Sequence, residues 1–468
     1  MTSSLSYALS ARSNSPRRPS NPRLDSAVFW GVFGLLLFGP LAFGAVEVWS
    51  ISMMQVGACL VFALWAVRQA AAGELEIVRN PLFLPILVFA GLVLGQLATG
   101  QTAYRAETSS SAMLYFTYGL LCFLVVQCLG RASQVQALAW VLSGYGFGIA
   151  MFALIEGVAA NGKLYWLRSL PSDGWIYGPY VNHNHYAGLM EMLTPIPLVI
   201  SFADGVRGHR KALAALVAAV MASTIFLSGS RGGMAAFAAQ MALLAGLMIT
   251  RRKNWRATPG LCAFLVIALG LLAWLGGGEF VERLASIHNG SRAELSGGTR
   301  LTIDHDAWRM FLQKPVFGWG LGVFPEIHPQ FSSLPTNLQA GMAHNDYLQL
   351  LVEMGGLGFA TCLWFLGRLF CSAARKINRW PQDVNAAVAL AAMLGVTGIL
   401  IHAFVDFNLQ IPANAAIFYV LCTIGAMEPR FDPYRPRRRS RAAGEGAGPN
   451  PERTLVATEG FQQHLPAS

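Results

Sequence analysis

Charged residues are scarce in this chain. Only 12% of its 468 residues are charged and 54% are hydrophobic, whereas soluble globular proteins carry about 25% charged residues. No polar stretch is long enough to form a large soluble domain. The composition therefore excludes an ordinary soluble protein and predicts that most of the chain lies in lipid.

Cysteine is sparse too, and its spacing matches neither a metal site nor a disulfide framework. The seven cysteines are scattered through apolar runs or at their ends, without any CxxC pair. We interpret them as small packing residues.

Long apolar runs are what the chain has in abundance. A bilayer core about 30 Å thick needs about 20 mostly apolar residues per helix, and such runs recur along the sequence. We therefore predict an all-α integral membrane protein with about twelve transmembrane helices and a large outer loop containing short amphipathic helices. The predicted spans are residues 28–46, 51–70, 81–98, 111–130, 135–157, 185–203, 211–228, 232–250, 258–276, 344–370, 385–405 and 411–427.

The basic residues predict an orientation for these spans. Twelve spans place both termini on one side, and if that side is the cytoplasm, 25 of the 34 Lys and Arg residues fall on it. This agrees with the positive-inside rule. We read the net charge of +10 as a topology signal and not as nucleic-acid binding, while binding of a partner by the basic termini stays open.

The predicted organisation has five parts. A cytoplasmic basic tail (1–27) precedes nine transmembrane helices (28–276), an outer loop (277–343), three more helices (344–427) and a cytoplasmic tail (428–468). The first part is too long and Pro-rich to resemble a cleaved signal peptide, so we expect the first span to be a retained anchor. The last part, rich in Arg, Gly, Ala and Pro, is predicted to be disordered.

Almost all the unusual polar motifs fall on the predicted outer face. Among them, Arg231 lies in "SGSRGG", between the seventh and eighth spans. An arginine at membrane depth costs roughly a few kcal/mol unless it reaches water or an anion. Glycines allow a ligand close to the backbone, and the start of a helix favours negative charge. Arg231 thus predicts an anion site, with snorkelling to lipid headgroups as the alternative.

Arg300 opens a second candidate anion-binding segment. The stretch 300–314 is predicted to form an amphipathic helix that ends before Pro315. Its alternative interpretation is a solvated helix on the membrane surface. The residues expected on its apolar side are Leu301, Ile303, Trp308 and Phe311.

His344 begins an apolar run directly after the outer loop. A neutral imidazole with an ordinary pKa near 6.5 can accept a proton at working pH, although a helix-capping histidine is the alternative. His402 and Asp406 are spaced i, i+4 and are predicted to hydrogen-bond each other, either as support for the site or as satisfied structural groups. Asn182 and His185, in "VNHNHYAG", are predicted to line a substrate path; a metal site there lacks a third ligand.

These residues resemble a known family. "RLTIDHDAWRMFLQKPVFGWGLGVF" followed by "AHNDYLQLLVEMGGLG" is similar to the signature of the O-antigen ligase and polymerase superfamily. "GPYVNHNHYAG", "SGSRGG" and "HAFVDFNLQIPAN" also resemble segments of its ligase-like members. The resemblance covers residues 175–415 and implies a GT-C-like multi-pass protein of the bacterial inner membrane, with cytoplasmic termini and a periplasmic outer loop.

The resemblance also implies roles. Arg231 and Arg300 match arginines thought to hold the diphosphate of an undecaprenyl-diphosphate-linked glycan, and His344 matches the histidine thought to activate the acceptor hydroxyl. Asn345, beside it, is expected to contact substrate. The implied enzyme is a glycosyltransferase without cofactor or metal, whose partners are the lipid-linked donor, a glycolipid or glycan acceptor and membrane lipids.

Several functions stay open at this point. Ligase, polymerase and protein glycan transferase share donor and leaving group, so the motifs do not separate them. A transporter of lipid-linked glycans also has about twelve spans, but its polar residues are expected near the bilayer midplane and in repeated halves. A scaffolding membrane protein would not require arginine in a glycine turn.

Overall fold

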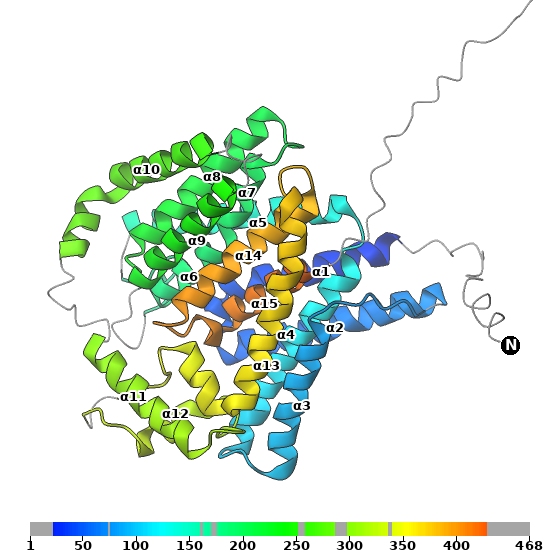
Figure 1. Cartoon of the computed structure of the whole chain (residues 1–468), viewed down its shortest axis with the longest axis vertical. Coiled ribbons are helices and arrows are strands. Elements are labelled where there is room, and N and C mark those ends of the chain that lie inside the picture. The colour runs from blue at the N-terminus through cyan, green and yellow to red at the C-terminus, as the bar shows by residue number, and fades with distance from the viewer. Residues whose placement is uncertain are drawn as a thin grey trace, which may run out of the picture. The chain divides into compact units, whose positions relative to one another are not determined.

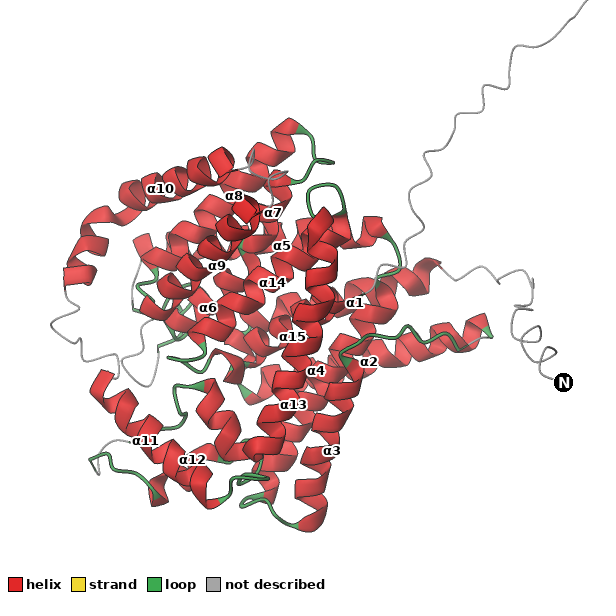
Figure 2. Ribbon diagram, viewed as in Figure 1, coloured by secondary structure: helices red, strands yellow, loops and turns green. Residues whose placement is uncertain are grey.

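The structure is built from helices. The computed structural model describes residues 22–73, 75–159, 162–169, 176–250, 258–285, 297–335 and 339–427. These ranges contain helices, two isolated bridges and no strand (Figure 2), which confirms the all-α prediction. The α-helices are α1 (Pro22–Leu41), α2 (Val48–Ala72), α3 (Phe83–Thr99), α4 (Arg105–Cys128), α5 (Ala132–Val158), α6 (His183–Leu193), α7 (Pro195–Phe202), α8 (Gly208–Leu227), α9 (Arg231–Thr250), α10 (Thr258–Ala285), α11 (Gly297–Gln313), α12 (Phe324–Ile327), α13 (Asp346–Lys376), α14 (Val384–His402) and α15 (Pro412–Ala426).

Many of these helices suit a bilayer. Eight described helices are long and apolar enough to cross a membrane: α1, α2, α4, α5, α8, α9, α14, and α13 extended to Arg379. Shorter apolar helices occupy 83–99, 259–274 and 412–426. The count of twelve spans stays a prediction. Two helices extend beyond the predicted spans: α1 starts six residues before the first span, and α10 continues nine residues into the predicted loop.

The predicted span 185–203 is interrupted at Thr194, between α6 and α7. Pro195 has no N–H, so the carbonyl of Glu191 loses its intrahelical donor. The side chain of Gln240, on α9, replaces that donor: its Nε2 lies 2.9 Å from the Glu191 oxygen and 3.0 Å from that of Leu394, on α14. One amide thus joins three helices and satisfies a backbone group in a water-poor interior.

Helices α14 and α15 lie at the centre of the bundle. Figure 1 shows them between the N-terminal helices and the group α5–α10. Helix α14 packs against α6, α7, α9 and α15, whereas α15 packs against α1, α4 and α13. Helix α11 lies along the first half of α13.

The glycine-rich turn after α11 inserts into a break in α13. Gly355 has a φ of +64° inside α13, and there the helix opens. The backbone of the turn supplies partners: Gly356 N donates to Pro315 O (2.7 Å), and Gly320 N donates to Glu353 O (2.9 Å). A Cβ at Gly355 would lie 2.3 Å from the carbonyl oxygen of Val316. Only glycine therefore allows the two backbones to meet.

Replacing Gly355 by alanine is expected to destabilise the protein by about 3 kcal/mol or more. The new side chain adds backbone strain of about 1–3 kcal/mol, since this combination of φ and ψ is used essentially by glycine alone, to a clash with backbone that has no flexible end to move. Thermal unfolding of the purified protein in detergent measures the effect. Gly367→Ala, on the same helix with no atom within 4 Å of its added Cβ, is the matched control. Equal unfolding temperatures for the two variants would contradict the interpretation.

Helix α11 confirms the predicted amphipathic helix, but part of its apolar side was assigned wrongly. Ile303, Ala307 and Met310 are buried. Leu301 is 71% exposed and Trp308 is 46% exposed. The spacing i, i+4, i+7 selects the buried face, which packs with residues of α12 and α13.

Candidate functional site

The candidate site lies where several helix ends meet. Helices α6, α9 and α13 begin there, α14 ends there, and α11 packs alongside. The connection 403–411 joins α14 to α15 and runs between these ends. Asp346 holds it in place: its carboxylate accepts from Leu409 N (3.1 Å) and Gln410 Nε2 (3.2 Å), and its own N–H donates to Ala403 O (2.9 Å).

The two predicted arginines approach this connection from different elements. Arg300, on α11, donates from Nη1 to the carbonyl oxygen of Val405 (2.8 Å). Arg231 is exposed at the first position of α9. Its neighbour Gly232 packs so closely that an added Cβ would lie 2.5 Å from the ring of His402 and 3.0 Å from Val405. The guanidinium of Arg300 and the backbone beside Arg231 thus both lie next to residues 402–405.

The turn before α9 fixes the backbone at the start of this helix. Gly229 has a φ of +78°, and Ser230 Oγ accepts from Gly233 N (3.1 Å). Arg231 therefore stands beside N–H groups at the positive end of a helix, where negative charge is favoured.

His344 lies in the short segment just before α13. Its φ is +54°, a left-handed conformation that is uncommon for residues other than glycine. Its ring meets the ring of Phe407 edge-on, with 4.7 Å between centroids. Its Nδ1 is buried and has no hydrogen-bond partner among the described residues. The imidazole is thus held at the site with one ring nitrogen unpaired among the described residues.

Burial lowers the pKa of His344 to about 4; Asp406 opposes the shift, and the charges of Arg300 and His185 add to it. The predicted ordinary value near 6.5 was therefore wrong for this environment. At neutral pH the imidazole is uncharged and can accept a proton.

A second histidine faces the same phenylalanine. The ring of His185, on α6, also lies 4.7 Å from that of Phe407, and its Nε2 is 3.7 Å from Asp406 Oδ1. Burial alone would raise the pKa of Asp406, but His185 and His402 beside it hold that pKa below its ordinary value. Asp406 is therefore an anion next to His185 and His402. Its charge also acts to raise the pKa of His344.

The predicted hydrogen bond between His402 and Asp406 was wrong. Helix α14 ends at His402, so the i, i+4 relation that would have joined the two side chains does not apply. His402 Nδ1 instead forms a 2.8 Å hydrogen bond with Glu191 Oε1, on α6. Both side chains are buried.

The two predicted asparagines are helix caps. Asn182 Oδ1 accepts from Asn184 N (2.8 Å) at the start of α6. Asn345 Oδ1 accepts from Tyr347 N and Leu348 N (both 3.2 Å) at the start of α13. Their caps hold the backbone next to His185 and His344, and their substrate-binding roles stay predictions. In the part of the chain that the structure describes, no three His, Cys, Asp or Glu side chains gather as metal ligands.

Two residues of this site were not predicted from the sequence. Phe407 carries no chemical signal, because an aromatic residue is ordinary in a membrane protein. Glu191 could have been found: an acidic residue inside an apolar run is costly and requires a partner.

The fold and the site by themselves indicate a class of protein. Many apolar helices, two arginines and an uncharged imidazole at one end of the bundle describe a multi-pass membrane protein with a site suited to an anionic substrate. Residues 216–363 match the family model described as O-antigen ligase. This region, which includes Arg231, Arg300 and His344, is similar to that family and supports a relation to the O-antigen ligase superfamily. No curated protein matches the chain.

Proposed function

We propose that this protein is an O-antigen ligase-like glycosyltransferase. It moves a glycan from an undecaprenyl-diphosphate donor to a hydroxyl of an acceptor such as lipid A-core, on the periplasmic face of the bacterial inner membrane. The observation that supports the proposal most is the buried imidazole of His344, whose Nδ1 has no hydrogen-bond partner among the described residues. The family match over the same residues agrees with it.

The proposed reaction exchanges one bond for another at the anomeric carbon of the glycan. The acceptor oxygen forms a bond to this carbon while the bond to the diphosphate oxygen breaks. His344 takes the proton of the hydroxyl, and the diphosphate leaves on its polyprenol. Arg231 and Arg300 offset the charge that develops on the leaving group, a task that guanidinium groups perform through paired hydrogen bonds. This division of roles requires no metal ion.

Donor binding would also raise the pKa of His344. An imidazole with a pKa near 4 is a weak base at neutral pH, and the positive charge of Arg300 is one reason for the low value. A diphosphate bound at the arginines brings opposite charge, which raises the pKa of a nearby imidazole. His344 would thus become a stronger base when the donor is in place.

Reconstitution tests the proposal and its alternatives. The purified protein in lipid vesicles is given an undecaprenyl-diphosphate-linked glycan, with lipid A-core or with no second acceptor. We expect a glycosylated product only when lipid A-core is present. Lengthening of the glycan without lipid A-core would make the protein a polymerase of the same superfamily. Movement of the donor across the vesicle membrane without any new glycosidic bond would make it a transporter.

A further inference from the structure

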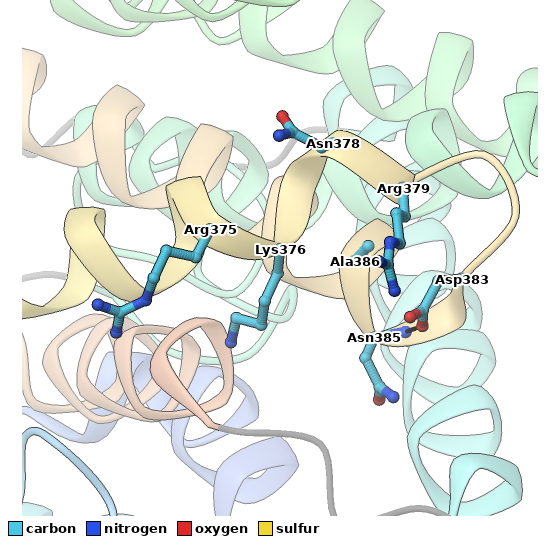
Figure 3. Close-up of a pocket in the computed structure, with 7 residues that line it drawn as sticks. All are labelled: Arg375, Lys376, Asn378, Arg379, Asp383, Asn385 and Ala386. Atoms are coloured by element: carbon cyan, nitrogen blue, oxygen red, sulfur yellow. Dashed lines mark hydrogen bonds between the residues drawn. The ribbon is translucent and has the colours of Figure 1, made fainter. Parts of the chain in front are cut away.

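A basic cavity lies at the other end of the bundle from the candidate site. Its volume is about 320 Å³, and its walls come from the end of α13, the following 3-10 helix (Ile377–Arg379) and the start of α14 (Figure 3). The residues that line it are Arg375, Lys376, Asn378, Arg379, Asp383, Asn385 and Ala386. The lining therefore contains three cations, two amides and one carboxylate.

Asp383 and Lys376, in the cavity wall, already have hydrogen-bond partners. Asp383 caps α14, where its Oδ1 accepts from Asn385 N (2.8 Å). The ammonium group of Lys376 donates to the carbonyl oxygens of Gly425 (2.6 Å) and Met427 (2.5 Å) at the end of α15. Among the described residues, the guanidinium of Arg379 has no hydrogen-bond or ion-pair partner, although its carbonyl accepts from Gln382 N and Asp383 N, and the guanidinium of Arg375 has one bond, to Ser372 Oγ (3.2 Å). Two guanidinium groups are thus available to an anion.

The cavity lies at the depth of lipid headgroups. Helix α14 runs from the cavity to the candidate site in 19 residues, which is about 28 Å at 1.5 Å per residue. This is close to the thickness of a bilayer core. The cavity therefore lies at the membrane surface opposite to His344.

The surface of α13 next to the cavity suits acyl chains. Trp364 lies eleven residues before Arg375, about three helical turns, so the two side chains share one face. Trp364 is 39% exposed, and its neighbour Leu363 is 53% exposed. Arg368 lies on this face between Trp364 and Arg375, and it is also exposed. The face changes from apolar to basic along the helix, as a bound phospholipid requires.

We propose that this cavity binds the phosphate of an anionic phospholipid whose acyl chains lie along the exposed face of α13. Basic pockets at helix ends are suited to such headgroups, and guanidinium forks match phosphate oxygens. The site is separate from the proposed transferase site and does not depend on it. The simpler alternative is that Arg375 and Arg379 bind no ligand. Their positive charges would then only stabilise the negative C-terminal end of the α13 helix dipole.

Native mass spectrometry tests the proposal on the full chain in detergent, titrated with cardiolipin. We expect Arg375→Gln/Arg379→Gln to lower the affinity for cardiolipin about tenfold or more. Arg207→Gln/Arg210→Gln removes the same charge at the same end of the bundle, where Asp204 N donates to Pro381 O, but outside the cavity wall. This matched control is expected to bind cardiolipin like the wild type.

Each alternative result overturns the assignment. Equal binding by wild type and both variants would show that cardiolipin does not use the cavity. Equal losses in both variants would show attraction by net charge alone. Displacement of cardiolipin by millimolar inorganic phosphate would assign the cavity to soluble phosphate and overturn the lipid assignment. Unfolding temperatures of both variants separate a loss of the site from a loss of structure.

Discussion

Replacing His344 by asparagine is expected to slow glycan transfer by about two to four decades. This is the usual contribution of a positioned general base, and asparagine has no group that accepts a proton at neutral pH. Asparagine also tolerates the left-handed backbone that position 344 requires, so the fold is expected to survive. Transfer in reconstituted vesicles measures the rate, and the unfolding temperature checks the structure.

The control for this variant is His305→Asn. The side chain of His305 is 69% exposed on α11, and its replacement is expected to leave the rate within about twofold, since surface substitutions cost little. A His344→Asn protein that folds and keeps more than a tenth of the wild-type rate would refute the role of His344 as the base.

The pH profile supplies a second measurement on the same residue. A lowered pKa in the free enzyme means that the base form persists to lower pH, so kcat/KM of the wild type is expected to stay nearly constant from pH 7 down to about pH 5.5. In the free enzyme it should fall only as the pH approaches 4, a value that kcat/KM reports. A midpoint near 6.5 would indicate a histidine exposed to water.

Replacing Arg300 by alanine is expected to lower the rate by about two to three decades, as does the loss of one donor that stabilises developing charge. Its Nη1 is held by the carbonyl of Val405, and its Nε is buried without a hydrogen-bond partner among the described residues. Arg300→Lys is expected to rescue little, because lysine keeps the charge but lacks the planar fork. Arg231→Ala is expected to show a loss of similar size.

The matched control is Arg309→Ala, on the same helix. The side chain of Arg309 is 51% exposed and lies 3.7 Å from Asp306, away from residues 402–405, so its loss is expected to change the rate little. Comparable losses in Arg309→Ala and Arg300→Ala would indicate a general effect of charge on the outer loop. Near-normal activity of Arg231→Ala would favour the snorkelling interpretation for that residue.

Local patterns in the sequence determined the helical class and the arrangement of its polar motifs. Apolar runs of bilayer length predict helices because a backbone in lipid must satisfy its own hydrogen bonds. The segment 300–314 was predicted as a helix from periodicity, and α11 confirms it. Arg231, Arg300 and His344 stood out because each is a costly polar residue at the edge of an apolar run, and the residues that resemble the family signature include Arg300 and His344.

Only the tertiary structure decided which side chains meet. Glu191 pairs with His402 across 211 residues of chain, and Phe407 contacts both His185 and His344. These contacts follow from the end of α14 at His402, the break between α6 and α7, and the glycine turn that enters α13. Each of these features depends on atoms from segments distant in sequence, such as Gln240 beside Glu191 or Val316 beside Gly355. A pattern read along one chain contains no such distances, so it shows which residues need a partner but not which partner they find.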